Sequence, residues 1–122
     1  MPVETPQRVL VTGGAGFIGS HLCRALLSRG AQVAVVDDLN DFYSPEEKRR
    51  NLASLEGSHR FTQADICDAP VIERLMSDLQ PDAIVHLAAR AGVRPSLEQP
   101  LLYEQVNVRG TLVLLEAARR HT

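Results

Sequence analysis

The chain has 122 residues, 44% of them hydrophobic, and a formal net charge of −2. This length allows one domain at most, and it is too short for a complete six-stranded doubly wound sheet. The charge gives no reason to expect a nucleic-acid or membrane partner, and no segment is typical of a membrane span or signal peptide. Cys23 and Cys67 form no CxxC pair and the four histidines are scattered, so we expect reduced thiols, a cytoplasmic protein and no metal site.

The first informative segment is residues 9–22, with the sequence VLVTGGAGFIGSHL. Its apolar start, Val9 to Val11, predicts a buried strand, and glycines follow at positions 13, 14, 16 and 19. A helix is expected next, with an apolar face formed by Ile18, Leu22, Ala25 and Leu26. Strand, glycine turn and helix in this order are typical of a dinucleotide-binding loop.

Each glycine has a separate physical role in such a loop. Gly13 and Gly14 allow a sharp turn, Gly16 allows the backbone to approach a pyrophosphate, and Gly19 allows the helix to pack closely on the strand. The helix N-terminus offers free N–H groups to the phosphates. A phosphate loop of the GxxxxGK type is excluded because Ser20-His21 stands where Lys and Ser or Thr are needed. A tight turn without a ligand is the alternative.

A second predicted strand, residues 31–37, ends in Asp37, which lies 21 residues after Gly16. This spacing is close to that of the carboxylate that binds the adenosine ribose hydroxyls, and a carboxylate there repels a 2′-phosphate. The sequence therefore favours NAD over NADP as cofactor. A helix cap or a solvated loop acid is the alternative role for Asp37.

The rest of the chain alternates helices and strands. A polar loop over residues 38–44 precedes a helix from Pro45 to about residue 55, whose basic run 48–50 we expect to be solvated. A strand over residues 60–66 is followed by a helix capped by Asp68. A strand over residues 83–89, a proline-containing loop and a helix over residues 101–120 complete the chain. Four right-handed βα units predict an α/β fold, the first half of a Rossmann doubly wound parallel sheet with strand order 3-2-1-4.

Five motifs together resemble the extended short-chain dehydrogenases/reductases, specifically the NAD-dependent epimerases/dehydratases of nucleotide sugars. The motifs are TGGAGFIGS at 12–20, DDLN at 37–40, DI at 65–66, HLAA at 86–89 and NVRGT at 107–111. They occur in family order over almost the whole chain. Two loops, NDFY at 40–43 and AGVRPS at 91–96, look most like those of UDP-glucuronate 4-epimerases.

The resemblance implies a set of residues that bind NAD. Asp65 and Ile66 would flank the adenine, residues 87–89 would line the crevice at the end of the fourth strand, and Asn107 would brace the strand ends or the cofactor. Alternatively, Asn107 is a hydrogen-bonded polar residue on a half-exposed helix. The full set of expected cofactor-binding residues is Gly13, Gly16, Phe17, Ile18, Gly19, Asp37, Asn40, Asp65, Ile66, Leu87, Ala88, Ala89 and Asn107.

The loop after the fourth strand holds the candidate substrate residue. Arg94 would lie beside the nicotinamide end of the crevice, where a guanidinium suits a sugar carboxylate or a diphosphate. A solvated loop arginine is the alternative. His86, a single histidine in an apolar strand, is expected to pack in the core and not to touch a ligand.

The resemblance also implies a Tyr-x-x-x-Lys pair as the catalytic machinery, and this chain shows none. Tyr43 has Lys48 five residues later, and Tyr103 has Asn107 at the fourth position, so no catalytic residue is assigned. We therefore expect residues 1–122 to be an incomplete NAD-binding domain, inactive by itself, of an enzyme that acts on a nucleotide sugar, preferably a UDP-sugar. A homodimer is expected for the complete protein. The alternative function is a non-catalytic dinucleotide-binding regulatory or interaction module.

Overall fold

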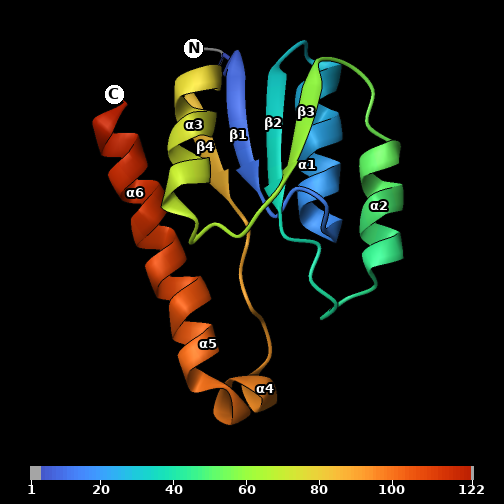
Figure 1. Ribbon diagram of the computed structural model, residues 1–122. Helices are drawn as coiled ribbons and strands as arrows, with labels where there is room; N and C mark the ends of the chain where they lie inside the picture. Colours follow the sequence, from blue (N-terminus) through green and yellow to red (C-terminus); the bar gives the residue numbers. More distant parts are fainter. Residues whose placement is uncertain (1–3, 122) are drawn as a thin grey trace.

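The computed structural model describes residues 4–121 and contains one four-stranded parallel sheet with helices on both faces (Figure 1). The strand order β3-β2-β1-β4 confirms the predicted topology. The strands are β1 (Arg8–Thr12), β2 (Gln32–Asp37), β3 (His59–Gln63) and β4 (Ala83–His86). The helices are α1 (Phe17–Ser28), α2 (Pro45–Ala53), α3 (Ala69–Leu79), α4 (Val93–Glu98), α5 (Pro100–Glu104), the π-helical turn η1 (Gln105–Arg109) and α6 (Gly110–Arg120).

The strand register aligns the carboxyl ends of the strands at one edge of the sheet. Thr12, the last residue of β1, pairs with Val36 of β2 and with His86 of β4. Asp37, which follows Val36, pairs with Gln63 at the end of β3. The loops that leave these four strand ends therefore start close together, which is where open α/β sheets bind their ligands.

Alternate residues of the central strands point into two separate hydrophobic layers. Leu10 and Val36 pack with helices α3 and α6 on one face of the sheet. Val11 and Val35 pack with α1 and the segment after α2 on the other face. Figure 1 shows α3 and α6 on one side of the sheet, with α1 and α2 on the other. Each valine or leucine buried in this way stabilises the fold by about 1.5–3 kcal/mol.

The predicted apolar face of α1 is wrong in part. Leu22 and Leu26 are half-buried, but Ile18 is 66% exposed and Ala25 is also exposed. The buried positions are Gly19, Ser20, Cys23 and Leu27. The helix is rotated toward this face because Gly19 lies against the backbone of the preceding loop, which leaves no room for a larger side chain.

Two strands end earlier than predicted because side-chain oxygens accept hydrogen bonds from the backbone amides that follow each strand. After β3, the Asp65 side chain accepts a hydrogen bond from the Cys67 amide at 2.8 Å, which turns the chain out of the sheet. After β4, the Leu87 amide is shared between the Thr12 carbonyl oxygen and the Thr12 hydroxyl, and the Ala88 amide donates to the hydroxyl. The helix predicted over residues 101–120 begins at Pro100 and is divided into α5, the π-helical turn η1 and α6, and the expected loop before it contains the short helix α4.

Within the described residues, β4 pairs with β1 only, and all four of its residues are half-buried. The apolar sequence of β4 predicts a strand covered on both faces, and the layers show this coverage only in part, with Ile84 packed against one layer and Val85 against the other. The outer edge of β4 has no strand beside it in the described part of the chain.

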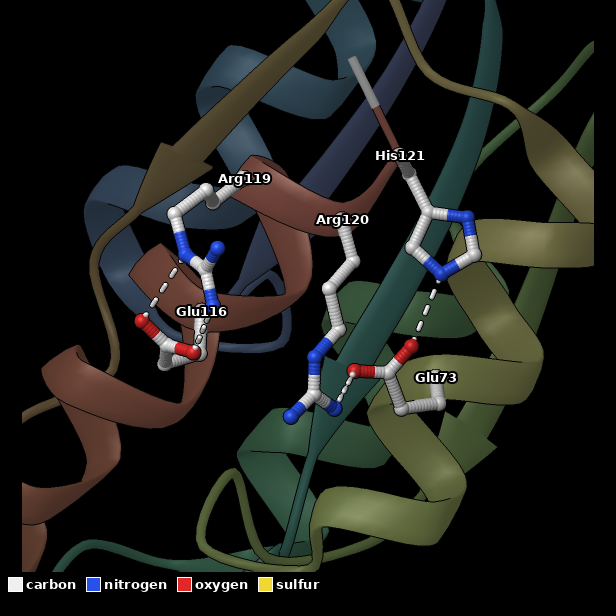
Figure 2. Close-up of polar contacts among 5 residues, drawn as sticks. All are labelled: Glu73, Glu116, Arg119, Arg120 and His121. Carbon is white, nitrogen blue, oxygen red and sulfur yellow. Dashed lines mark hydrogen bonds and ion pairs between the residues drawn. The ribbon is translucent and has the colours of Figure 1, made fainter.

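A charged cluster joins α3 to the end of α6. Glu73 accepts hydrogen bonds from Arg120 Nη1 at 3.0 Å and from His121 Nε2 at 2.8 Å, and Figure 2 shows its two carboxylate oxygens divided between these partners. Glu116 pairs separately with Arg119 on α6. The hydrogen bond from His121, together with Arg120, lowers the pKa of Glu73 below its usual value.

We predict that protonation of the Glu73 carboxylate in acid lowers the stability of the fold. A lowered folded-state pKa means that the stabilisation is present above the unfolded pKa of about 4.3 and is lost as the pH falls through the folded value. Glu73→Gln should therefore lower the melting temperature slightly at pH 7 and leave it unchanged at pH 3, measured by circular dichroism. Glu56→Gln, at an exposed position for which residues 4–121 show no ion pair, is the control. Identical melting temperatures for Glu73→Gln and the parent at pH 7 would contradict the prediction.

Candidate functional site

The loop between β1 and α1 is shaped by contacts that only glycine permits. Gly13 has φ +70°, and a Cβ atom there would lie 2.8 Å from the amide nitrogen of Ala88. A Cβ atom at Gly19 would lie 2.2 Å from the carbonyl oxygen of Gly13. Gly19 therefore lets α1 pack on the loop backbone, and not on the strand as the sequence predicts.

Gly16 differs from its neighbours because the protein does not crowd it. A Cβ atom there would be 3.4 Å from the Gly13 carbonyl oxygen, the only atom within 4 Å among the described residues other than the two chain neighbours of Gly16. Gly16 is also the N-cap of α1, no side chain among residues 4–121 caps this helix, and its first turn contains no acidic residue. The positive end of the helix dipole therefore faces the loop without a negative charge from its own first turn, which suits a phosphate.

Asp37 lies at the end of β2 and is 8% exposed. Its Oδ2 accepts a hydrogen bond from the Ala15 amide at 3.2 Å, and its Oδ1 accepts one from the Leu39 amide at 2.9 Å. The carboxylate thus fixes the glycine loop to the next strand. Each carboxylate oxygen can accept a further hydrogen bond, so both remain able to bind a ligand hydroxyl.

Two residues of α2 complete this side of the site, and the sequence analysis missed both. Lys48 is 7% exposed, and its Nζ donates to the Asn40 carbonyl oxygen at 2.9 Å. Asn51 Nδ2 donates to the Ala15 carbonyl oxygen at 2.8 Å. The prediction of a solvated basic run is wrong for Lys48. The available signal was the i, i+3 spacing of Lys48 and Asn51, which puts them on one face of the helix.

The opposite wall comes from the segment after β3. Ile66 is buried, whereas Asp65 is exposed at the rim. A Cβ atom at Gly110, the first residue of α6, would lie 2.4 Å from Ile66 Cδ1. Gly110 therefore allows α6 to approach Ile66 closely and contributes to the shape of this wall.

The loop after β4 is held by Asn107 of η1. The Arg90 amide donates to Asn107 Oδ1 at 2.8 Å, and Asn107 Nδ2 donates to the Arg90 carbonyl oxygen at 3.0 Å. Asn107 thus braces the chain after the strand end, one of the two roles that the sequence analysis gives it. Arg94 lies on α4 and is exposed, and residues 4–121 show no hydrogen bond or ion pair of its side chain.

These elements enclose two adjoining hollows at the carboxyl edge of the sheet. Gly13, Gly16, Leu87 and Ala89 line both hollows. The larger has a volume of about 830 Å³, within the range of small-molecule sites. Of the residues predicted to bind a cofactor, those that line one hollow or both are Gly13, Gly16, Phe17, Ile18, Gly19, Asp37, Asn40, Asp65, Ile66, Leu87, Ala88 and Ala89. Asn107 and Arg94 do not line them.

The described residues also bear on the predictions about the cysteines, a metal site and a membrane span. Cys23 and Cys67 are free thiols, and burial raises the pKa of Cys23 to about 11. Residues 4–121 contain no group of three or more His, Cys, Asp or Glu side chains arranged to hold a metal ion. No helix within these residues combines the length and apolarity needed to cross a bilayer.

The sequence of residues 10–122 matches the model of the GDP-mannose 4,6 dehydratase family. The chain belongs to this family. Its relatives include dTDP-glucose 4,6-dehydratase 1 of Escherichia coli (strain K12), 44% identical over 94% of this chain and 32% of that protein. UDP-glucuronate 4-epimerase 3 of Arabidopsis thaliana is 43% identical over 91% of this chain and 26% of that protein. The predicted relationship to epimerases and dehydratases is confirmed.

Solved structures of related enzymes have the same fold over this region. The UDP-glucose 4-epimerase of Thermus thermophilus, in complex with NAD, superposes with a TM-score of 0.80 at 43% identity, over 93% of this chain and 34% of that chain. The UDP-glucose 4-epimerase of Stenotrophomonas maltophila, with bound NAD and formylated UDP-arabinopyranose, superposes with a TM-score of 0.81 at 39% identity. The match covers 93% of this chain and 33% of that chain. This member of the GDP-mannose 4,6 dehydratase family spans about a third of the length of these relatives.

We predict unequal losses of stability for alanine at Gly19 and at Gly16. Gly19→Ala places a methyl group against backbone atoms that cannot move away, and should destabilise the fold by about 3 kcal/mol. Gly16→Ala has room for the methyl group and should cost no more than about 1 kcal/mol. Urea unfolding followed by circular dichroism measures both. Equal loss of stability in the two variants would contradict the packing described for Gly19.

Proposed function

We propose that the chain is the NAD-binding portion of a nucleotide-sugar epimerase or dehydratase. One observation carries this proposal: the uncapped N-terminus of α1, the uncrowded Gly16 and the buried Asp37 border the same groove. The donors at the helix end suit a pyrophosphate, and the acceptor at the end of β2 suits ribose hydroxyls. Family membership and the NAD named for the related structures support this cofactor.

Each wall of the groove has a part in this function. The α1 N-terminus binds the pyrophosphate, and Asp37 accepts hydrogen bonds from the ribose while Ala15 and Leu39 hold it in place. Asp65 and Ile66 flank the adenine. Leu87, Ala88 and Ala89 leave space for the nicotinamide half. When bound there, NAD would accept a hydride from the sugar reversibly.

The substrate is a nucleotide sugar, and a UDP-sugar fits the family resemblance. Relatives named as UDP-glucuronate 4-epimerases and dTDP-glucose dehydratases have nearly equal identity to this chain, which supports the general class. Exposed Arg94, on the helix that follows the groove loop, binds the sugar carboxylate or the diphosphate. No residue of this chain is proposed as the catalytic base, and a cytoplasmic location remains a prediction.

A non-catalytic dinucleotide-binding module is the less favoured function. Such a module needs the same groove, so the groove does not argue against it. The relatives reported above are named as dehydratases and epimerases, and this supports the enzymatic function. We also propose that residues 1–122 belong to one NAD-binding domain, and that its sheet is incomplete without further strands.

We predict that the chain binds NAD at least ten-fold more tightly than NADP, measured by isothermal titration calorimetry. The reason is the carboxylate of Asp37, which accepts ribose hydroxyls and repels a 2′-phosphate. Gly16→Ala should weaken NAD binding because its methyl group occupies the space of the pyrophosphate. Equal affinity for both cofactors would contradict the role of Asp37, and binding of neither would contradict the proposed site.

We also propose that the complete protein is a homodimer that uses the outer face of η1 and α6. Val108, Leu112 and Leu115 are 50%, 56% and 60% exposed, and they recur four and three residues apart. A helical stripe of this kind is typical of a helix–helix interface.

We predict that the chain runs as an oligomer or aggregate in size-exclusion chromatography, because this stripe is exposed. Leu112→Glu should shift the protein toward the monomer, since a charge opposes burial of the stripe. Leu97→Glu, at a 77% exposed position on α4, is the matched control and should not change the elution. A parent chain that elutes as a single monomer peak would contradict this interface.

A further inference from the structure

We propose that His86 is a positioning residue of the dinucleotide groove, acting in its neutral form with the proton on Nε2. Its ring joins the end of β1 to the start of α6, and through them it holds the segment that forms the groove floor. The link to NAD rests on the proposed function, whereas the tautomer is independent of it.

The tautomer follows from counting donors around Thr12. Thr12 is fully buried, and its Oγ1 accepts hydrogen bonds from the amides of Leu87 at 3.0 Å and Ala88 at 3.1 Å. The Leu87 amide is shared between this hydroxyl and the Thr12 carbonyl oxygen, which lies 3.1 Å away. A hydroxyl oxygen has two lone pairs, so both are occupied. The Thr12 hydroxyl proton is then available for His86 Nδ1, which lies 2.6 Å away. Nδ1 must therefore be an acceptor without a proton.

The other ring nitrogen continues the same chain of hydrogen bonds. With the proton on Nε2, His86 donates to Thr111 Oγ1 at 3.1 Å. The Thr111 hydroxyl donates in turn to the Asn107 carbonyl oxygen at 2.7 Å. Asn107 also holds the backbone of Arg90 through its side-chain amide. Every donor in this network has an acceptor when the ring is neutral, and this arrangement is consistent with the proposed tautomer.

Protonation of the ring would disrupt the network. A proton on Nδ1 would face Thr12 Oγ1, which already accepts two amide hydrogens, and the Thr12 hydroxyl proton would lose its acceptor. The groups that face the ring are the hydroxyls of Thr12 from β1 and Thr111 from α6. Arg90 and Arg109 are the charged residues on the adjoining loop and on η1, and neither bonds to the ring within residues 4–121. Burial lowers the pKa of His86, which favours the neutral form.

The network affects the shape of the groove because the residues that it holds line the groove. Leu87 and Ala88, whose amides bind Thr12, line the hollows. Thr12 immediately precedes Gly13, and a Cβ atom on Gly13 would lie 2.8 Å from the Ala88 nitrogen. A shift of Thr12 or of Ala88 would therefore change the separation between the glycine loop and the floor after β4.

The first test is the protonation state of His86 at pH 7, read from the two ring nitrogens by long-range ¹H–¹⁵N NMR. We expect the neutral Nε2–H tautomer for His86 at pH 7. An Nδ1–H tautomer, or a charged ring at pH 7, would overturn the proposal. This measurement needs no ligand and stands even if NAD does not bind.

The second test uses NAD as the probe and calorimetric affinity as a function of pH. Affinity of the parent should fall several-fold as the pH is lowered through the His86 titration. His86→Asn should remove this pH dependence, because the amide oxygen can replace Nδ1 as the acceptor for Thr12 but does not titrate. His86→Leu should lose at least ten-fold in affinity at neutral pH.

The matched pair Thr111→Val and Thr111→Ser separates the hydrogen bond from packing. Thr111→Val keeps the shape without the hydroxyl and should weaken NAD binding, whereas Thr111→Ser keeps the hydroxyl and should restore it. This pair decides the question if His86→Leu fails to fold, as judged by circular dichroism. An unchanged affinity in Thr111→Val together with an unchanged pH profile in His86→Asn would overturn the proposal. A parent chain that does not bind NAD would instead contradict the proposed function.

Discussion

The contact between the start of α1 and the loop before it is the constraint on which the site depends. The missing side chain of Gly19 lets the helix approach the Gly13 carbonyl, and the missing side chain of Gly13 lets the loop approach Ala88. These two close approaches bring the ends of β1 and β4 and the N-terminus of α1 together. A larger residue at either glycine would separate the elements that form the groove.

Side chains that are not part of the glycine loop hold it in position. Asp37 binds the Ala15 amide from β2, and Asn51 binds the Ala15 carbonyl from α2. Lys48 anchors the next loop through the backbone of Asn40. Because these contacts come from different elements, a ligand meets a site that is already ordered, and less conformational entropy is lost on binding.

On the other side of β1, the Thr12 side chain adds to and then replaces the sheet pairing of the backbone. Thr12 binds the two amides that follow β4, and His86 connects this threonine to Thr111. The strand therefore ends at His86, and the next three residues become part of the groove wall. A buried polar network of this kind, with every group paired, fixes one arrangement of the strand ends.

The sequence by itself determined the topology, the glycine loop and the position of Asp37, because these depend on local patterns: apolar runs, glycine spacing and the distance to an acid. It also placed twelve of the thirteen expected cofactor residues at the groove. Only the tertiary structure decided the burial of Lys48, the rotation of α1 toward Cys23 and the partners of His86. These depend on residues far apart in the chain, such as Thr12 and Thr111, whose approach is set by how the helices pack on the sheet. Spacing in the sequence does not encode that approach.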